Sequence, residues 1–93
     1  MNILSQDGKT LVNYDNVASL YMEEVHRQYI NPDKWWEIRV MYPTVSENVL
    51  CDTIAKFNEE EKCIEVFNVL LDEIDDEFSF INIKNICRNR YGK

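Results

Sequence analysis

The sequence predicts an α+β fold in which an antiparallel meander sheet of four to five strands is packed by one amphipathic helix. Three observations carry this prediction: an Asp7-Gly8 turn between two short apolar runs, two-residue alternation over residues 35–42, and apolar residues spaced by three and four after Asn58. With 93 residues, 45% of them hydrophobic, the chain has apolar material for one core. We therefore expect a single domain, with a sheet over residues 1–57, a helix over 58–77 and a basic tail over 78–93.

The first strands are predicted to form a hairpin. Residues 3–5 and 10–12 are short apolar runs, and residues 6–9 between them contain Asp7-Gly8, which supplies the positive φ that hairpin turns need. Residues 14–16 predict a second turn. Residues 17–25 suit a strand, although periodicity alone also permits a short helix, and Pro32 ends this element.

The clearest strand passes through the two tryptophans. Its residues alternate between two faces, Trp36, Ile38, Val40 and Tyr42 against Trp35, Glu37, Arg39 and Met41. One tryptophan should therefore face the core while the other is exposed beside Met41 and Tyr29. Pro43 ends the strand, and after residues 44–48 the run 49–57 predicts the last strand of the sheet.

The helix is predicted over about residues 58–75. Asn58 is a favourable N-cap, and Glu61, three residues later, can bond back to the Asn58 amide as in a capping box. The apolar residues recur at spacings of three and four and predict one stripe against the sheet: Cys63, Val66, Phe67, Leu70, Leu71 and Ile74.

The tail permits two interpretations. The apolar residues Phe78, Phe80, Ile81 and Ile83 suit a strand, whereas Phe80, Ile83, Ile86 and Cys87 also fall at helical spacing. We favour a short second helix, with Ser79 or Asn82 as its cap and Gly92 as its end.

Charge is divided unevenly along this chain of net charge −7. Residues 59–77 hold nine acids against Lys62 alone, whereas residues 78–93 hold bases and no acid: Lys84, Arg88, Arg90 and Lys93. The last turn of the predicted helix is crowded with acids: Asp72, Glu73, Asp75, Asp76 and Glu77. Exposed acids there oppose the helix dipole at about 0.3 to 1 kcal/mol each. We expect compensation either by the tail folding back over the acids or by the basic surface of a partner protein.

The sequence lacks the residue patterns typical of nucleophilic catalysis and of metal binding. His26 is the only histidine and is predicted to lie on the surface at a strand end, so no nucleophile and base pattern is built around it. The three cysteines are widely spaced in apolar surroundings, which predicts reduced thiols in a cytosolic protein. Asp72, Asp75 and Asp76 share a helix face but have no calcium loop around them. We expect no enzyme activity, metal or cofactor, and no membrane-spanning segment.

Three segments resemble a group of small, mostly uncharacterised proteins from Firmicutes bacteria and their phages and prophages. These segments are Ile3-Leu4-Ser5-Gln6-Asp7-Gly8, Asn13-Tyr14-Asp15-Asn16-Val17, and Ile54-Ala55-Lys56-Phe57-Asn58-Glu59-Glu60-Glu61-Lys62-Cys63. The resemblance implies a meander sheet followed by one helix and, through its phage context, small inhibitors of host defence. This chain departs from the pattern at Ala55 (Gly in the group), Phe57 (Tyr) and Glu59 (Ser or Thr). Residues 75–93 lie outside the resemblance.

Two functional hypotheses follow. The first is a non-enzymatic interaction protein in the cytoplasm of a bacterial host, which inhibits a defence component such as a CRISPR effector. Its contacts with a basic partner surface would be Trp35 and the acids Asp72, Glu73, Asp75, Asp76 and Glu77. The second is an oligomer that sequesters a cyclic-nucleotide immune signal through Arg39, Arg88, Arg90 and Trp36. Direct nucleic-acid binding by the basic tail is disfavoured because the neighbouring acids repel phosphates.

Overall fold

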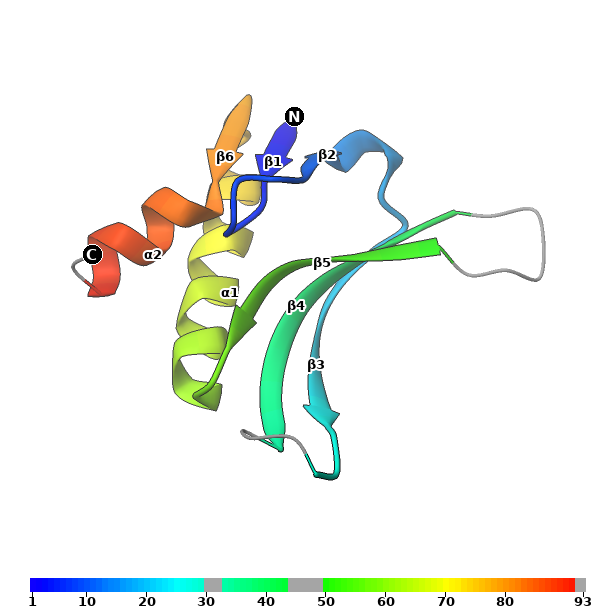
Figure 1. Ribbon diagram of the computed structural model, residues 1–93. Helices are drawn as coiled ribbons and strands as arrows, with labels where there is room; N and C mark the ends of the chain where they lie inside the picture. Colours follow the sequence, from blue (N-terminus) through cyan, green and yellow to red (C-terminus); the bar gives the residue numbers. More distant parts are fainter. Residues whose placement is uncertain (30–32, 44–49, 92–93) are drawn as a thin grey trace.

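The computed structural model describes residues 1–29, 33–43 and 50–91. Their elements follow the order β1 (Asn2–Leu4), β2 (Leu11–Asn13), the 3-10 helix η1 (Tyr14–Asn16), β3 (Ser19–His26), β4 (Lys34–Tyr42), β5 (Leu50–Phe57), α1 (Glu60–Asp75), β6 (Phe80–Asn82) and α2 (Ile83–Tyr91). The predicted α+β class is confirmed (Figure 1). Pro32, residues 44–48, Gly92 and Lys93, to which the sequence assigned roles, lie outside the described residues.

The strands form two sheets, not the single predicted meander. The small sheet has the order β2-β1-β6 and the large sheet the order β3-β4-β5. The chain changes sheets between residues 14 and 18. Tyr14 donates its backbone N–H to Met1, beside β1, whereas Ala18 donates to Met41 on β4. The predicted hairpin lies in the small sheet, and Gly8 in its turn has a φ of +74°.

In the small sheet the middle residue of each strand is buried. Ile3 lies opposite Val12 on β2 and Ile81 on β6, and all three side chains are almost fully enclosed. β6 pairs with β1 in parallel, so this sheet joins the two ends of the chain. Leu11 and Phe80, on the other face, are exposed.

The large sheet keeps the predicted alternation of β4. Ile38 and Val40 are fully buried, and Trp36 and Tyr42 pack against the same core. The pairing of β4 with β5 shifts between Ile38 and Arg39. Residues 17–25, for which strand and helix were both open, lie largely in the strand β3.

α1 crosses between the two sheets and contacts β4, β5 and β6 (Figure 1). Its buried face consists of Cys63, Val66 and Leu70, with Phe67, Val69 and Ile74 packed beside them. Leu71, predicted to join this stripe, is exposed instead, whereas Val69, on the other flank of Leu70, packs against the core.

The predicted cap of α1 is wrong. Glu59, not Asn58, occupies the N-cap position and makes no side-chain capping bond. β5 runs through Phe57, whose side chain is 7% exposed, so the chain needs two further residues to turn from strand into helix. The N-cap side chain therefore accepts no hydrogen bond from the first backbone N–H groups of α1.

The tail adopts both predicted forms in succession. β6 comes first, and α2 follows directly with its first residue, Ile83, fully buried. The Asn85 backbone N–H donates to Asn82 Oδ1 at 3.3 Å, which confirms Asn82 as a cap. β6 therefore adds a strand to the small sheet after α1, beyond residues 1–57, which the sequence assigned to the sheet.

Candidate functional site

The five acids at the end of α1, Asp72, Glu73, Asp75, Asp76 and Glu77, are called here the acidic end. The helix stops there in a Schellman motif, in which Phe78 donates its N–H to the Glu73 carbonyl and Glu77 donates to the Ile74 carbonyl. Glu77 has a φ of +60°, a conformation that usually belongs to glycine. The backbone is thereby held in a defined turn with acidic side chains around it.

The described tail does not cover the acidic end. Arg90 pairs with Glu65, with 3.6 Å between Arg90 Nε and Glu65 Oε2, and Glu65 belongs to the first half of α1. Within the described chain no salt bridge joins a base to the acidic end. Of the bases predicted to compensate these acids, Lys84, Arg88 and Arg90 form no salt bridge with the acidic end, since α2 carries them toward other parts of the molecule, and Lys93 lies outside the described residues.

Glu73 is the least solvated member of the acidic end. Burial raises the pKa of its carboxyl above the ordinary value, and the neighbouring Asp76 carboxylate raises it further. Its Oε2 is buried without a hydrogen-bond partner. A cation brought to this site would supply the missing partner.

Exposed apolar side chains adjoin the acidic end in the sequence. Leu71, Phe78 and Phe80 are 40%, 47% and 52% exposed. Phe78 and Phe80 lie on the segment that leaves the Schellman motif and enters β6, an outer strand of the small sheet. Aromatic side chains are enriched in protein interfaces, whose apolar centre is surrounded by a polar rim.

Trp35 does not belong to this surface. It is 8% exposed, its Nε1–H donates to Glu37 Oε2 at 2.8 Å, and Lys56 Nζ lies 4.4 Å from its ring centroid. The predicted exposed tryptophan is therefore wrong, because Glu37 and Lys56 occupy both its polar edge and its ring face. Tyr29 is exposed, as expected.

The residues predicted to hold a nucleotide are not brought together. Trp36 and Arg39 point to opposite faces of β4, since Trp36 packs against the core while Arg39 pairs with Glu23 and Glu37 on the other face. Arg90 pairs with Glu65 on α1. Arg88 borders a hollow that Gln6, Lys84 and Cys87 also line.

That hollow is part of a groove that sequence analysis missed. Three hollows of about 350, 320 and 230 Å³ share Gln6, and we call the second and third together the Gln6 groove. The groove is lined by Gln6, Lys56, Phe57, Asn58, Glu59, Lys62, Lys84, Cys87 and Arg88. Its lining residues include members of β5, α1 and α2, and the ammonium of Lys56 is directed to the Trp35 ring. The only sequence signal for it was the pair Lys84 and Arg88, four residues apart.

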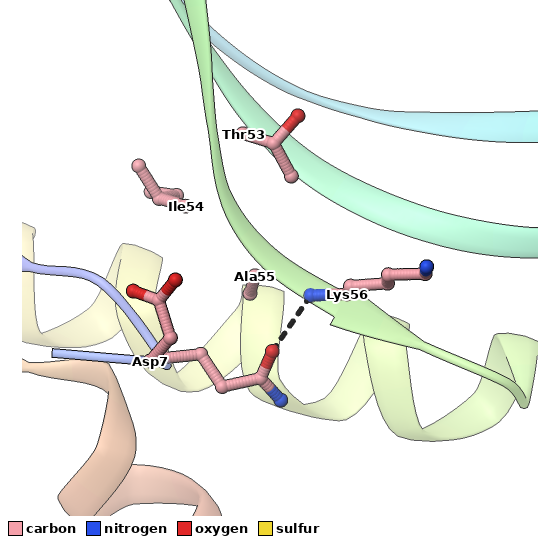
Figure 2. Close-up of a pocket in the computed structure, with 6 residues that line it drawn as sticks. Asp7, Thr53, Ile54, Ala55 and Lys56 are labelled. Atoms are coloured by element: carbon pink, nitrogen blue, oxygen red, sulfur yellow. Dashed lines mark hydrogen bonds between the residues drawn. The ribbon is translucent and has the colours of Figure 1, made fainter. Parts of the chain in front are cut away.

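Gln6 is held firmly between the two sheets. Its backbone N–H donates to the Ile54 carbonyl at 2.8 Å, and its Oε1 accepts the Lys56 backbone N–H at 2.8 Å. Figure 2 shows this second bond among the residues that line the first hollow, with the Lys56 side chain extending away from Asp7. Both bonds go to β5, so they fix the hairpin turn against the edge of the large sheet.

The thiols and the histidine are not arranged for nucleophilic chemistry. Burial raises the pKa of Cys63 to about 11 and raises that of Cys87, so both thiols stay protonated near neutral pH. His26 lies on the surface at the end of β3, as predicted, with Nε2 3.0 Å from Glu24 Oε2. All three cysteines are free thiols, as expected.

The described residues contain no cluster of three or more His, Cys, Asp or Glu side chains arranged to hold a metal ion. No helix among them has both the length and the apolar character needed to cross a bilayer.

No protein-family model, curated protein or solved structure matches this chain.

Proposed function

We propose that this chain is a non-enzymatic binding protein that uses the acidic end of α1, together with Phe78 and Phe80, to engage a partner protein with a basic surface. The observation that carries the proposal is that none of the five acids pairs with a base in the described chain. Carboxylates left unpaired at a helix C-terminus destabilise the free protein. A basic partner surface would offset that cost, so the acidic end would stabilise a complex although it destabilises the free protein.

The resemblance of residues 3–8, 13–17 and 54–63 to small proteins of Firmicutes phages and prophages supports a biological setting. In that setting the partner is a component of bacterial defence, such as a CRISPR effector, met in the bacterial cytoplasm. Proteins that bind nucleic acid present Lys and Arg to phosphates. An acidic surface on a rigid turn can occupy such a site in place of nucleic acid.

The test compares two variants that lose the same charge at opposite ends of α1. One is Asp72→Asn with Asp76→Asn, in the acidic end, and the matched control is Glu60→Gln with Glu61→Gln, in the first turn. Partners are captured from the bacterial host, identified by mass spectrometry, purified, and titrated against each variant by calorimetry.

We expect the acidic-end variant to bind its purified partner at least tenfold more weakly, while the control binds like the wild type. The wild-type affinity should also fall as salt rises, because exposed charges are screened. Phe78→Ser with Phe80→Ser should weaken binding without changing the salt dependence. Equal losses in the acidic-end variant and in the control would refute the assignment of this surface.

A further inference from the structure

β3 has an open edge along one side. The large sheet has the order β3-β4-β5, so β3 is one of its two outer strands (Figure 1). The other outer strand, β5, is closed by the hairpin turn, since its backbone bonds to both the main chain and the side chain of Gln6. Within the described chain no strand pairs with the outer edge of β3. β3 runs for eight residues without a proline or a bulge, features that commonly keep an edge strand unpaired.

The hydrogen bonds of β3 show which of its backbone groups face the open edge. Arg27 donates its N–H to the Asp33 carbonyl at 2.7 Å, in the same register that pairs β3 with β4. Backbone groups alternate in direction along an antiparallel strand, so every second residue before Arg27 also bonds to β4. The N–H and carbonyl groups of Glu24 and His26 therefore point away from β4, to the open edge.

The sequence along this edge is complementary to itself. Residues 23–27 read Glu-Glu-Val-His-Arg. If two copies run antiparallel with Val25 opposite Val25, each Glu23 lies opposite Arg27 of the other copy, and each Glu24 lies opposite His26. The same register brings the outward backbone groups of Glu24 and His26 together, as an antiparallel ladder requires. Side-chain charge and backbone direction thus select one register.

The charges at the two ends of this segment are available for such pairing. Arg27 is exposed, and among residues 1–29, 33–43 and 50–91 it forms no salt bridge. Glu23 is 44% exposed and pairs with Arg39 through Oε2, so Oε1 can accept a bond from a second guanidinium. Opposite charges directly across two strands attract, whereas like charges there repel.

Apolar side chains meet at the centre of this register. Val25 is half-buried and lies opposite Trp35 on β4, on the face of the large sheet away from the core. Pairing about Val25 places four side chains in one row, Trp35 and Val25 from each copy. The contact then has an apolar centre with charged pairs on both sides, which is the usual composition of a protein interface.

We propose that the open edge of β3 pairs antiparallel with the same edge of a second copy of this chain, with the two-fold axis at Val25. The two three-stranded sheets then join into one sheet of six strands, in the order β5-β4-β3-β3-β4-β5. A two-fold axis repeats each contact, so the pair of Glu23 with Arg27 forms twice. This surface is separate from the acidic end, and the inference does not depend on the proposed function.

Analytical ultracentrifugation of the intact chain, from nanomolar to high micromolar concentration, measures self-association. Arg27→Glu and Glu23→Arg each place like charges opposite each other in a homodimer. A mixture of these two variants restores both opposite-charge pairs, because one copy then has acids at positions 23 and 27 and the other has arginines. Arg88→Glu is the control, since it makes the same charge reversal on α2, away from β3 (Figure 1).

A second pair of variants tests the backbone ladder. His26→Pro removes an N–H that faces the open edge, and proline is tolerated on an edge strand where the N–H is not needed within the sheet. His26→Ala is its matched control, because it removes the imidazole and keeps the N–H. Circular dichroism checks that each variant folds.

We expect the wild type, Arg88→Glu and His26→Ala to form dimers. Arg27→Glu, Glu23→Arg and His26→Pro should each raise the dimer dissociation constant at least about tenfold, and the mixture of the two charge variants should restore dimers. Arg27→Glu and His26→Pro decide the question even if Glu23→Arg, beside Arg39, fails to fold. A wild type that stays monomeric over the whole range, or dimers that survive both Arg27→Glu and His26→Pro, would overturn the proposal.

Discussion

Glu77→Gly tests whether the end of α1 is held in a strained conformation. Glu77 has a φ of +60° at the position of the Schellman motif where glycine is usual. A residue with a Cβ destabilises the folded state by about 1 to 2 kcal/mol in this region, and glycine removes that strain. The greater freedom of glycine in the unfolded chain lowers stability by about 0.5 to 1 kcal/mol and offsets part of the gain. Removing a carboxylate from the negative end of the helix adds about 0.3 to 1 kcal/mol.

The free energy of unfolding should therefore rise by about 1 kcal/mol, which for a domain of this size raises the melting temperature by about 4 to 8 °C. Urea unfolding followed by circular dichroism at 222 nm measures the change. Glu77→Ala is the matched control, because it removes the charge and keeps the Cβ. If the glycine variant is no more stable than the alanine variant, the argument from backbone strain is refuted.

Three further changes test the packing and charge of the same scaffold. Glu73→Gln should stabilise the protein at pH 7. The pKa of the Glu73 carboxyl is raised in the folded protein, so this group favours folding only below its ordinary pKa of 4.5 and loses that contribution as the pH rises through the folded-state pKa. Urea titrations at pH 7 and pH 4 should show the advantage disappearing at the lower pH, and an advantage that persists there would contradict the reasoning. Leu70→Ala removes a fully buried side chain of α1 and should lower the free energy of unfolding by about 2 to 5 kcal/mol in the same assay. Ser5→Ala should cost about 1 to 3 kcal/mol, since the 2%-exposed Ser5 hydroxyl donates to Asp7 Oδ1 at 2.6 Å and accepts the Thr10 N–H at 3.0 Å; an unchanged urea midpoint would show that the turn does not need this bridge.

Local signals in the sequence predicted most of the individual elements. Gly8 marked the hairpin turn, alternation marked the buried face of β4, and Asn82 was one of two candidate caps for the last helix. Each of these signals depends on neighbours within a few residues, so it can be read without knowing the rest of the fold.

The candidate sites were predicted less well. The acids of the acidic end were visible as a run, but their lack of a base in the described chain depended on where α2 carries Arg90, which is to Glu65. Trp35 was assigned to the surface because alternation turns it away from the core. Two side chains enclose Trp35: Lys56, on the neighbouring strand β5, and Glu37, two residues further along β4.

By itself the sequence determined the α+β class, the amphipathic helix and the uneven charge, since these follow from composition and short-range periodicity. Tertiary structure alone decided that β6 pairs in parallel with β1, that the strands divide into two sheets, and that residues of β5, α1 and α2 line one groove beside Gln6. The physical reason is distance along the chain. Ile3 and Ile81 come into register only when the whole core closes, and no pattern within either segment specifies its partner.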